Sequence, residues 1–426
     1  MIRKNRNRLF RRLFKHSQLN LKDVEKARDY IEKFWVNLER YHPHDEESSI
    51  GLPHPFLVPA YDRDATFNFD EMYYWDSYFM IQGFLKDTKH KKLVMGILDN
   101  QLAMIKRFGM VPNATKTYLT GRSQPPLLTS FIFDVYNAYQ LDDRWLEQAI
   151  NYAKTEYKTV WMGTKKPHYH QVFEGLSRYY DNNMIHDLAE AESGWDMTTR
   201  FGRRCLEYLP VDLNCFLYKY EKDFQRAAEI LKKPREAEQW KTAASKRKHM
   251  VNTYMWSNLR NFYFDYNFQK KKKSQVASLA AYTAMWSGLA IKKQAHELVA
   301  ELSRFEYSGG LATTEDLAIK QAWPKKVPTQ WAYPNGWAPL HFFVVEGLEN
   351  YEYHGVAERI AQKWLKNNLD WFNKHGVFLE KYNVVNTAKE PIEGLYPSQT
   401  GFGWTNAVFE RFCQDYIDPS DKSPIV

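Results

Sequence analysis

Cysteine is scarce in this chain of 426 residues, which contains only Cys205, Cys215 and Cys413. So few cysteines, and an odd number of them, do not build a disulfide framework, and their spacing matches no zinc-binding motif. The amino terminus, MIRKNRNRLFRRLFKH, also lacks the apolar run of about 7–15 residues that a secretory signal requires. Both absences favour a reducing compartment, and we expect the protein to be cytoplasmic.

Membrane-spanning runs and cofactor motifs are also missing. The uncharged segment at residues 274–291 contains Ser, Gln, Thr and several small residues, so it predicts a buried helix rather than a membrane span. The sequence has no phosphate-binding loop, dinucleotide fingerprint, G-x-S-x-G motif or H-E-x-x-H motif. The histidines and acids at residues 42–47 lack the periodicity of metal ligands. We therefore expect neither a cofactor nor a metal.

Positive charge is concentrated at the amino terminus. The formal net charge is +8, and residues 1–16 supply seven of these charges, so the remainder is nearly neutral. A nearly neutral body requires no nucleic-acid partner. We divide the chain into a basic tail, residues 1–16, and a single folded domain, residues 17–426. The tail is interpreted as a solvated arm, with contact to RNA or anionic lipid as the alternative, and the lysines at residues 270–273 as a solvated loop.

Helical periodicity dominates the rest of the sequence. Apolar residues recur at three- and four-residue steps within residues 24–38, 146–160 and 356–365, as on the buried face of an amphipathic helix. Gly376 follows the last of these segments, where a C-terminal cap would end the helix. Alternating strand patterns are scarce. With 44% hydrophobic and 26% charged residues, the sequence predicts a soluble all-α protein.

Long loops rich in Gly, Pro and aromatic residues separate these helices, at residues 42–69, 109–126, 308–337 and 380–404. Structureless stretches of this length in a compact protein usually carry function. Aromatic residues make up 16% of the chain, and flat rings with polar atoms suit stacking against sugars as well as core packing.

Six segments combine Trp, Gly and acids in a way that packing does not demand. Cleavage of a glycosidic bond needs one carboxyl group to protonate the leaving oxygen and a second to activate water or attack the anomeric carbon. Acids in such loops are therefore candidates, although any single acid is more often a surface charge. The segments are FDEMYYWDSYF (69–79), VPNATKTYLTGRSQPP (111–126), AESGWDMTTRF (191–201), PTQWAYPNGWAP (328–339), FLEKYNV (378–384) and YPSQTGFGWTN (396–406).

These segments, in this order, resemble the motifs of the trehalase family over residues from about 53 to 412. The resemblance implies an all-α (α/α)6 barrel with long functional loops at one end, and hydrolysis of an α-glycoside with inversion at the anomeric carbon. The matching residues are Phe69, Glu71, Tyr73, Trp75 and Asp76 in one signature, Gln330, Trp331, Pro334, Asn335, Gly336 and Trp337 in another, and Asn113, Arg122 and Gln124 in a third.

By the same match, Asp196 resembles the family's general acid and Glu380 its general base. Inversion implies that the two carboxyl groups are roughly 6.5–9.5 Å apart, with room for a water molecule. Asp196 must keep its proton near neutral pH, and burial beside Trp195 would favour the neutral form. The alternative is that the two acids merely pair with nearby cations such as Arg200 and Lys381.

The resemblance also implies a sugar pocket, in which polar side chains bond hydroxyl groups and aromatic rings form the walls. Taken singly, Tyr73 and Trp75 could equally be core residues, and Arg122 could brace a loop. The expected partner is a small carbohydrate. The substrate-binding residues that the match implies are Phe69, Tyr73, Trp75, Asp76, Asn113, Arg122, Gln124, Gly194 and Trp337.

The sequence departs from the family pattern at four points, and the resemblance assigns the missing arginine loop and the late acid mainly to the leaving-group sugar. We therefore expect a retained glucose-like donor subsite beside an altered acceptor subsite. The function would be that of a trehalase or a trehalase-like α-glucosidase. The departures are Asn68 in place of Arg, Ala332 and Leu395 each in place of an acid, and a missing Arg-Pro-Glu-Ser loop between Tyr180 and Glu192.

Two alternatives to this function remain. The first is a hydrolase of another α-glycoside, such as glucosylglycerate, mannosylglycerate or an α-linked oligosaccharide. The second is a catalytically inactive sugar-binding protein. Retention of both Asp196 and Glu380 argues against the second alternative.

Overall fold

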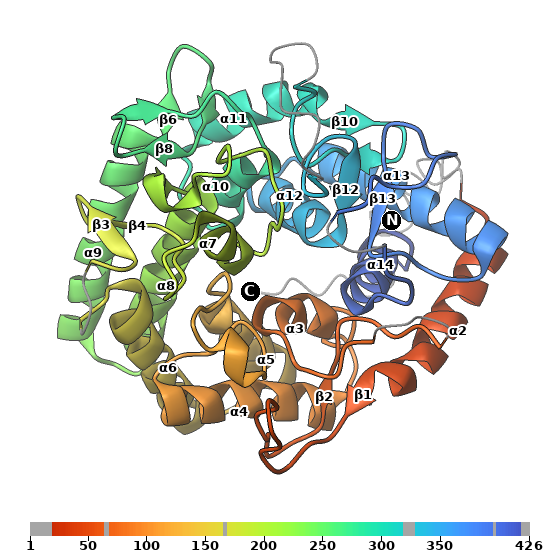
Figure 1. Cartoon of the computed structure of the whole chain (residues 1–426), viewed down its shortest axis with the longest axis horizontal. Helices are drawn as coiled ribbons and strands as arrows, with labels where there is room; N and C mark the ends of the chain where they lie inside the picture. Colours follow the sequence, from red (N-terminus) through yellow and green to blue (C-terminus); the bar gives the residue numbers. More distant parts are fainter. Residues whose placement is uncertain (1–18, 64–67, 165–167, 318–328, 395–397, 419–426) are drawn as a thin grey trace, which may run out of the picture.

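The computed structural model describes residues 19–63, 68–164, 168–317, 329–394 and 398–418. Its helices form two concentric rings, and outer and inner helices alternate along the chain (Figure 1). This is the (α/α)6 barrel that the family resemblance implied. The outer ring contains α2 (Leu21–Leu38), α4 (Lys91–Phe108), α6 (Asp143–Glu156), α9 (Pro234–Tyr254), α11 (Lys292–Glu301) and α13 (His354–His375). The inner ring contains α3 (Tyr74–Ile81), α5 (Leu128–Tyr139), α8 (Val211–Ile230), α10 (Thr283–Trp286), α12 (Ala338–Asn350) and α14 (Gly403–Tyr416).

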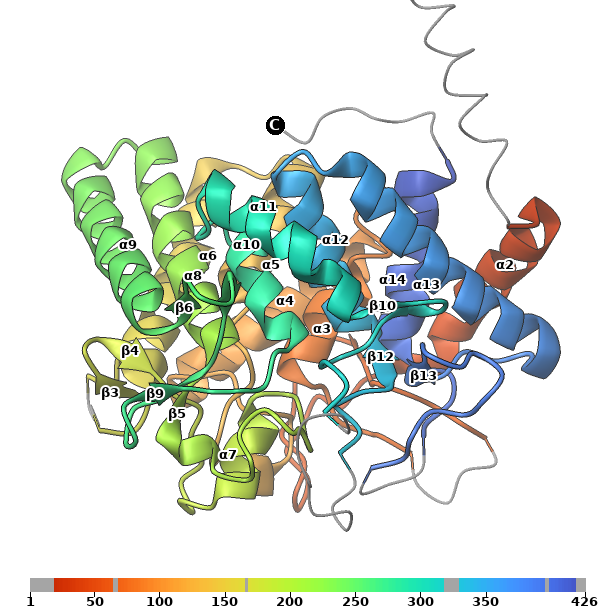
Figure 2. The same ribbon diagram turned by 90° about the horizontal axis from the view of Figure 1, so that it is seen from above.

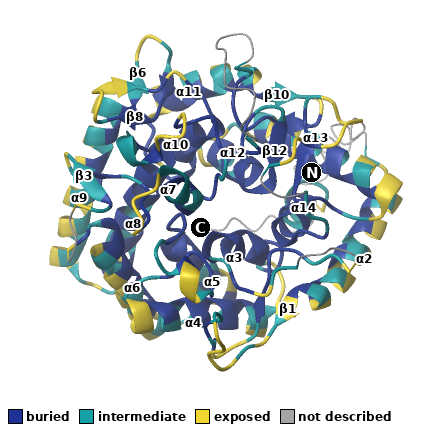
Figure 3. Ribbon diagram, in the orientation of Figure 1, coloured by how far each residue is buried: buried dark blue, intermediate teal, exposed yellow. Residues whose placement is uncertain are grey.

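The two rings differ in burial (Figure 3). All eight residues of the inner helix α3 are buried. In the outer helix α2, buried residues recur at three- and four-residue steps from Val24 to Leu38, with solvent-facing residues between them. The stripe predicted at residues 146–160 forms the buried face of α6 and of the π-helical turn that follows it (Tyr157–Trp161), and the stripe at residues 356–365 lies on the buried face of α13. The helical periodicity of the sequence is thus confirmed.

Local signals in the sequence fix several helix ends. The side-chain oxygen of Asn20 caps α2 by accepting a hydrogen bond from the backbone N–H of Lys22 at 3.1 Å. Asp142 caps α6 in the same way, through the N–H of Trp145 at 2.8 Å. Gly376 ends α13 with a φ of 75°, the left-handed conformation expected of a C-terminal cap.

The barrel closes where its last inner helix meets its first helices. α14 packs against both α3 and α2 (Figure 1). Arg28 of α2 donates to the two carboxylate oxygens of Glu410 in α14 at 2.8 and 2.6 Å, and to Asp418 at 2.7 Å. The two ends of the described chain are therefore joined by a partly buried ion-pair cluster.

Short antiparallel hairpins lie in the connections between the helices. Figure 2 shows α7 (His186–Glu192) and several of these strands gathered at one end of the barrel, opposite the α8–α9 and α12–α13 connections. This agrees with the expectation of long loops at one end. The strands are β1 (Glu39–Arg40), β2 (Phe56–Leu57), β3 (Gln171–Phe173), β4 (Leu176–Ser177), β5 (Tyr208–Leu209), β6 (Trp256–Ser257), β7 (Phe262–Tyr263), β8 (Tyr266–Asn267), β9 (Lys272–Lys273), β10 (Glu306–Tyr307), β11 (Gly310–Leu311), β12 (Asn335–Trp337) and β13 (Lys381–Asn383).

Two expectations need correction. Residues 274–291 are largely buried, but they do not form one helix, because the helical part is confined to a 3-10 turn and α10. Gly288 adopts a φ of 74° after α10, and this left-handed conformation ends the helix. Residues 270–273 belong to a hairpin between β8 and β9 rather than to an irregular loop, and most of them are exposed, as expected.

Three other expectations concern the periphery of the molecule. Among the helices described, none is long and apolar enough to cross a membrane. Within the described ranges, no group of His, Cys, Asp and Glu side chains is arranged to hold a metal ion. In the stretch at residues 42–47, Asp45 instead accepts hydrogen bonds from Arg107 at 2.8 and 2.6 Å. The basic tail, residues 1–16, lies outside the described residues.

Candidate active site

Three acidic residues from distant parts of the chain come together at the loop end of the barrel. Asp196 follows α7, Glu380 directly precedes β13, and Asp76 lies in the first turn of α3. Burial raises the pKa of Asp76 and of Asp196 most, and neighbouring charges add to it: Glu380 acts on both, and Asp196 also acts on Asp76. The fold thus brings the predicted acid and base to one site.

Asp196 has the properties of a proton donor at neutral pH. Its side chain retains some exposure, whereas the neighbouring Trp195 is buried. Desolvation by burial, reinforced by the negative charge of Glu380, raises the pKa of Asp196 to about 7, although Arg122 and Lys381 act in the opposite direction. The expectation that burial would favour the neutral form therefore agrees with the structure.

The backbone of the Asp196 loop is held from several sides. The side-chain amide of Gln330 donates to the carbonyl oxygen of Asp196 at 2.6 Å, and the N–H of Trp331 donates to the carbonyl of Met197 at 3.0 Å. Gly194 adopts a φ of 74°, and a Cβ at this position would lie 2.5 Å from the ring of Trp75. Gly194 is therefore required by backbone conformation and by close packing, whatever its contact with substrate.

Glu380 stands in a different environment, because it is buried and paired with a cation. Only 1% of its surface is exposed, and Nζ of Lys381 lies 2.7 Å from its Oε2 atom. The indole N–H of Trp404 donates to the carbonyl oxygen of Glu380 at 3.1 Å. Of the two cations considered as simple partners of the candidate acids, Lys381 does pair with Glu380. Arg200 instead pairs with Asp212 and Asp265, at 2.8 Å in each case.

Tryptophan rings form a packed cluster around these loops. The rings of Trp331 and Trp337 stack in parallel, with centroids 3.7 Å apart and planes inclined by 4°. Trp75, Trp195 and Trp404 contact Trp331, with centroid distances between 5.6 and 6.1 Å. All five side chains are buried. Trp75 and Trp337, predicted as walls of the sugar pocket, thus belong to a rigid aromatic layer that joins four motif segments.

The polar residues of the 111–126 loop contact the beginning of α3. The side-chain oxygen of Gln124 accepts a hydrogen bond from the backbone N–H of Trp75 at 3.0 Å. The Asn113 amide donates to the carbonyl of Ser123 at 3.3 Å. Both side chains are buried. The structure therefore brings Asn113 and Gln124 to the site. Part of the hydrogen-bonding capacity of their side chains is used to hold the loop in place.

Arg122 lies at the same site with one of its nitrogen atoms unpaired. Its guanidinium Nη1 lies 3.1 Å from Asp181, and its charge acts on Asp196. The Nε atom of Arg122 is buried and has no hydrogen-bond partner in the described part of the chain. A buried donor of this kind is costly unless it is satisfied, for example by a ligand.

Phe69 and Tyr73 form a half-buried aromatic edge beside the acids. Their rings meet at 88° with centroids 5.7 Å apart, and the hydroxyl of Tyr73 donates to Glu71 at 3.1 Å. Burial first, and then the charges of Glu71, Asp76 and Asp196, raise the pKa of Tyr73. Tyr73 therefore stays neutral near the carboxyl groups.

Sequence reasoning assigned no role to Glu190 and Glu192, although both lie near or within a motif segment. Glu192 accepts hydrogen bonds from the backbone N–H groups of Ser123 at 2.8 Å and Tyr180 at 2.6 Å, and contacts His170 at 3.1 Å. It thereby ties α7 to the 111–126 loop. Burial raises the pKa of Glu190 to about 8. The family match singles out Asp196, but it gives no signal for the contacts that Glu190 and Glu192 make.

The departures from the family pattern leave neutral groups where acceptor-side charges were expected. The side chain of Asn68 is bonded to the backbone of Asp62, accepting at 2.8 Å and donating at 2.8 Å. Ala332 is buried. Asp181 follows Tyr180 directly and pairs with Arg122. Leu395 lies outside the described residues.

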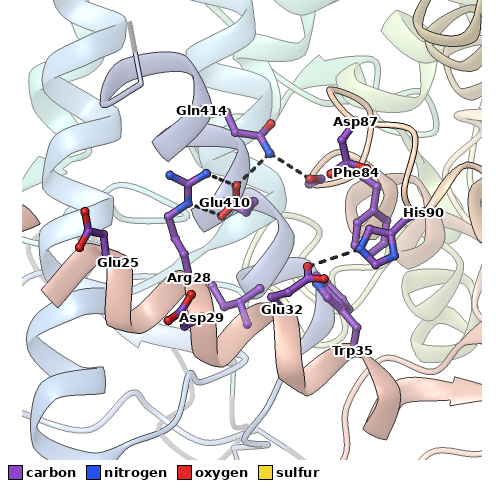
Figure 4. A pocket seen from close by; sticks show the side chains of 12 residues that line it. Glu25, Arg28, Asp29, Glu32, Trp35, Phe84, Asp87, His90, Glu410 and Gln414 are labelled. Atoms are coloured by element: carbon purple, nitrogen blue, oxygen red, sulfur yellow. Dashed lines mark hydrogen bonds and ion pairs between the residues drawn. The ribbon is translucent and has the colours of Figure 1, made fainter. Parts of the chain in front are cut away.

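A surface cavity of about 290 Å³ lies elsewhere, between α2, α14 and the turn after α3 (Figure 4). Four of its titratable residues form two contacts: Arg28 lies 2.6 Å from Glu410, and His90 lies 3.4 Å from Glu32. It contains none of the candidate residues. This hollow is a crevice between packed helices and is separate from the candidate site.

Two neighbouring carboxyl groups in different electrostatic surroundings, set among tryptophans at the loop end of an (α/α)6 barrel, are the arrangement of a glycoside hydrolase. The sequence model of the trehalase family matches residues 3–191 and 168–416, so the chain belongs to the trehalase family.

Solved structures agree with this assignment. The neutral trehalase of Saccharomyces cerevisiae is 27% identical, with a TM-score of 0.73, and the match covers 91% of this chain and 79% of that one. A mannosylglycerate hydrolase from Thermus thermophilus, solved in complex with glucose, is 17% identical, with a TM-score of 0.67 and coverage of 91% and 99%. The second likeness shows the fold alone.

Proposed function

We propose that this protein is an inverting α-glucosidase of the trehalase type, with Asp196 as general acid and Glu380 as general base. The observation that carries the proposal is the contrast between the two carboxyl groups. The pKa of Asp196 is raised to about 7, so a large share of it holds a proton near neutrality. Glu380 lies 2.7 Å from the ammonium group of Lys381, which favours its charged form. Paired acid and base catalysis requires one carboxyl group that holds a proton and a second that is free to accept one.

The proposed reaction follows from these states. Asp196 gives its proton to the glycosidic oxygen as the bond between that oxygen and the anomeric carbon breaks. A water molecule attacks the opposite face of the same carbon, and Glu380 accepts a proton from it. The products are the inverted sugar and the free alcohol. Asp196 is left ionised and Glu380 protonated, and exchange of both protons with solvent restores the starting state.

The donor side of the pocket supports a glucose-like sugar. Asp76 and Arg122 interact electrostatically with the two carboxyl groups, and Nε of Arg122 has no hydrogen-bond partner among the described residues. Phe69 and Tyr73 supply a half-buried aromatic edge. A few placed polar groups against aromatic walls are typical of carbohydrate pockets.

The acceptor side supports a leaving group other than glucose. Asn68 and Ala332 are neutral, and Asn68 is already bonded to the backbone of Asp62. Loss of several charged hydrogen bonds, each worth on the order of 2–4 kcal/mol in a desolvated site, would reduce trehalose cleavage roughly a thousandfold. The similar structures include both a trehalase and a mannosylglycerate hydrolase by name, and glycerate is therefore the second candidate leaving group.

A substrate panel with product stereochemistry tests the proposal. The purified full-length protein is incubated with α,α-trehalose, kojibiose, nigerose, glucosylglycerate, mannosylglycerate and α-glucosyl fluoride, and early product is followed by proton NMR. We expect rapid release of β-glucose from the fluoride and a much lower kcat/KM for trehalose. Early α-glucose would overturn the acid and base assignment. Sugar binding without turnover of any compound would indicate a binding protein instead.

The cysteines support the further proposal that the protein works in the cytoplasm. Cys205, Cys215 and Cys413 are all free and buried. Unpaired thiols are usual in a reducing compartment. Fractionation of cells that express the tagged full-length chain tests this proposal, and recovery from an oxidising compartment would contradict it.

A further inference from the structure

Lys381 is a buried cation beside the proposed base. Its side chain has 0% of its surface exposed, and Nζ lies 2.7 Å from Oε2 of Glu380, whose side chain is 2% exposed. A lysine without access to water is costly unless its charge is balanced. Glu380 supplies that balance, so the two side chains form a fully buried ion pair.

The contact between Glu380 and Lys381 is not a simple result of their adjacency. Consecutive residues of a strand point to opposite faces of a sheet. Glu380, however, lies in a bend immediately before β13, and Lys381 is the first residue of that strand. The bend at Glu380 therefore brings its carboxylate to the ammonium group of the next residue.

The ammonium group is held in place by the neighbouring strand. Lys381 is paired in register with Trp337 of β12, and Nζ lies 5.1 Å from the centre of the Trp337 ring. Such a cation–π contact is strengthened where water is excluded. Trp337 is itself fixed by parallel stacking on Trp331 at 3.7 Å and by an indole hydrogen bond to the carbonyl of Gln330 at 3.2 Å. The position of the cation is thus determined by the tryptophan cluster.

We propose that Lys381 is a positioning residue that holds Glu380 as an oriented carboxylate, ready to accept a proton from the attacking water. This inference rests on the proposed function, in which Glu380 is the general base. Lys381 itself touches neither the water nor the sugar in this scheme. Its effect is on the charge and direction of Glu380.

The other groups that face Glu380 make this cation necessary. Glu380 interacts with the carboxyl groups of Asp76 and Asp196, and like charges disfavour ionisation of one another. The α14 residues that bond its backbone, Trp404 and Thr405, are uncharged. Among the described residues, the titratable and charged groups around the site include Asp76 and Tyr73 from the start of α3, Arg122 from the 111–126 loop, Asp196 from the loop after α7, and Lys381 from β13.

The pH dependence of kcat/KM distinguishes a charge effect from a purely structural one. We compare wild type with Lys381→Met, Lys381→Gln and Lys381→Arg in the full-length protein. The substrate is α-glucosyl fluoride, since fluoride needs little protonation to leave. The fall in kcat/KM at low pH, the acidic limb of the profile, then reports protonation of the base. Lys389→Met, which changes an exposed lysine in the segment that follows β13, is the matched control.

For both neutral variants we expect the acidic limb to move to higher pH by about one unit or more, with the plateau about 10²-fold lower. Lys381→Arg, which keeps the charge, should restore the limb to near its wild-type position, and Lys389→Met should leave the whole profile unchanged. A lower plateau with an unmoved limb in both neutral variants would overturn the inference, because a merely structural lysine has that effect.

Two further measurements separate a failure of this inference from a failure of the proposed function and from misfolding. Glu380→Gln tests the proposed function separately: if it retains turnover, the base assignment fails, whereas an inactive Glu380→Gln with an unmoved limb in the lysine variants refutes only the inference. Thermal melting monitors folding of every variant. If neither neutral variant folds, Trp337→Phe provides the test by weakening the contact that confines Lys381. The acidic limb must then move to higher pH by less than is expected for the neutral lysine variants, and an unmoved limb would overturn the inference.

Discussion

The loop that carries Asp196 and the strand end that carries Glu380 present the same functional group in two different settings. Asp196 is partly exposed and forms no ion pair within the described ranges, and burial raises its pKa to about 7. Glu380 is almost fully buried but contacts Lys381 at 2.7 Å. Burial favours the neutral form of a carboxyl group, and a cation in contact favours the charged form. The proposed roles of the two carboxyl groups, as proton donor and proton acceptor, therefore rest on the partner more than on the depth of burial.

The means of support also differ between the two regions. The Asp196 loop is held through its backbone, by Gln330 and by close packing of Gly194 on Trp75. Glu380 is held through its side chain as well, by an ion pair that rests on Trp337. Substitutions in the first region should thus act mainly by displacing the acid, and substitutions in the second by changing the charge of the base.

The largest expected effect comes from removing either of the two carboxyl groups compared above. Asp196→Asn and Glu380→Gln should each lower kcat on a natural glycoside by about 10²–10⁴-fold or more, since each removes a proton-transfer role. On α-glucosyl fluoride, Asp196→Asn should regain most of the kcat that it loses on the glycoside, whereas Glu380→Gln should not. Steady-state kinetics on both substrates measures the difference.

Suitable controls for this experiment lie close by. Asp187→Asn changes a partly exposed acid of α7 that pairs with Arg203, and Glu393→Gln changes an exposed acid of the loop that follows β13. Both should keep near wild-type rates. Equal losses for Asp196→Asn on the two substrates would remove the distinction between acid and base.

The next effect concerns the backbone support of Asp196. Gly194→Ala should lower kcat by about 10–100-fold and destabilise the protein by about 2–4 kcal/mol, because the added methyl group would collide with Trp75 at a φ of 74°. Gly175→Ala is the matched control, since Gly175 has a φ of 80° but no atom within 4 Å of the added Cβ. It should cost only about 1 kcal/mol, without loss of activity. Melting curves and kcat values for the pair separate conformational strain from collision, and an active Gly194→Ala would refute the packing argument.

The basic limb of the pH profile should sharpen the assignment of Asp196. A general acid works only while it holds its proton, so kcat/KM on a glycoside with a poor leaving group should fall about tenfold per pH unit above about pH 7. The fluoride, which depends less on the acid, should show a flatter basic limb. A fall of the same steepness on both substrates would assign the limb to another group.

The smallest expected effect is on stability. The pKa of Asp196 is higher in the folded protein than the usual value of 3.8, so the folded state loses stability relative to the unfolded state as pH rises from about 4 through about 7. Asp196→Asn has no charge to desolvate and should be more stable than wild type at pH 8, by on the order of 1 kcal/mol. The advantage should shrink at pH 5. Urea unfolding at both pH values measures it, and an advantage that grows toward low pH would contradict the sign.

Much of the architecture could be predicted from local pattern. The stripes of α2, α6 and α13 are periodic in the sequence because an outer helix faces solvent on one side. The structure of residues 274–291 was harder to predict, since a segment buried on all sides has no periodicity. The turn at Gly288, which depends on the backbone conformation that the tertiary structure imposes, ends the helix early.

The residues of the site could likewise be predicted only in part from the sequence. Motif order placed Asp76, Arg122, Asp196 and Glu380 in one pocket, and the electrostatic coupling among them agrees with that grouping. The bracing role of Glu192 was not predictable, because its partners are backbone groups of loops far away in the sequence.

The sequence by itself determined the helical rings, the loop segments and the acidic residues that belong to them, because periodicity and motif spacing are local properties of the chain. Only the tertiary structure decided which cation meets which acid: Arg200 is taken by Asp212 and Asp265, while Lys381 remains with Glu380. Pairing and burial depend on where distant segments meet after the barrel has closed. Since a carboxyl group's proton affinity is set by those neighbours, the raised pKa of Asp196 arises only in the folded protein.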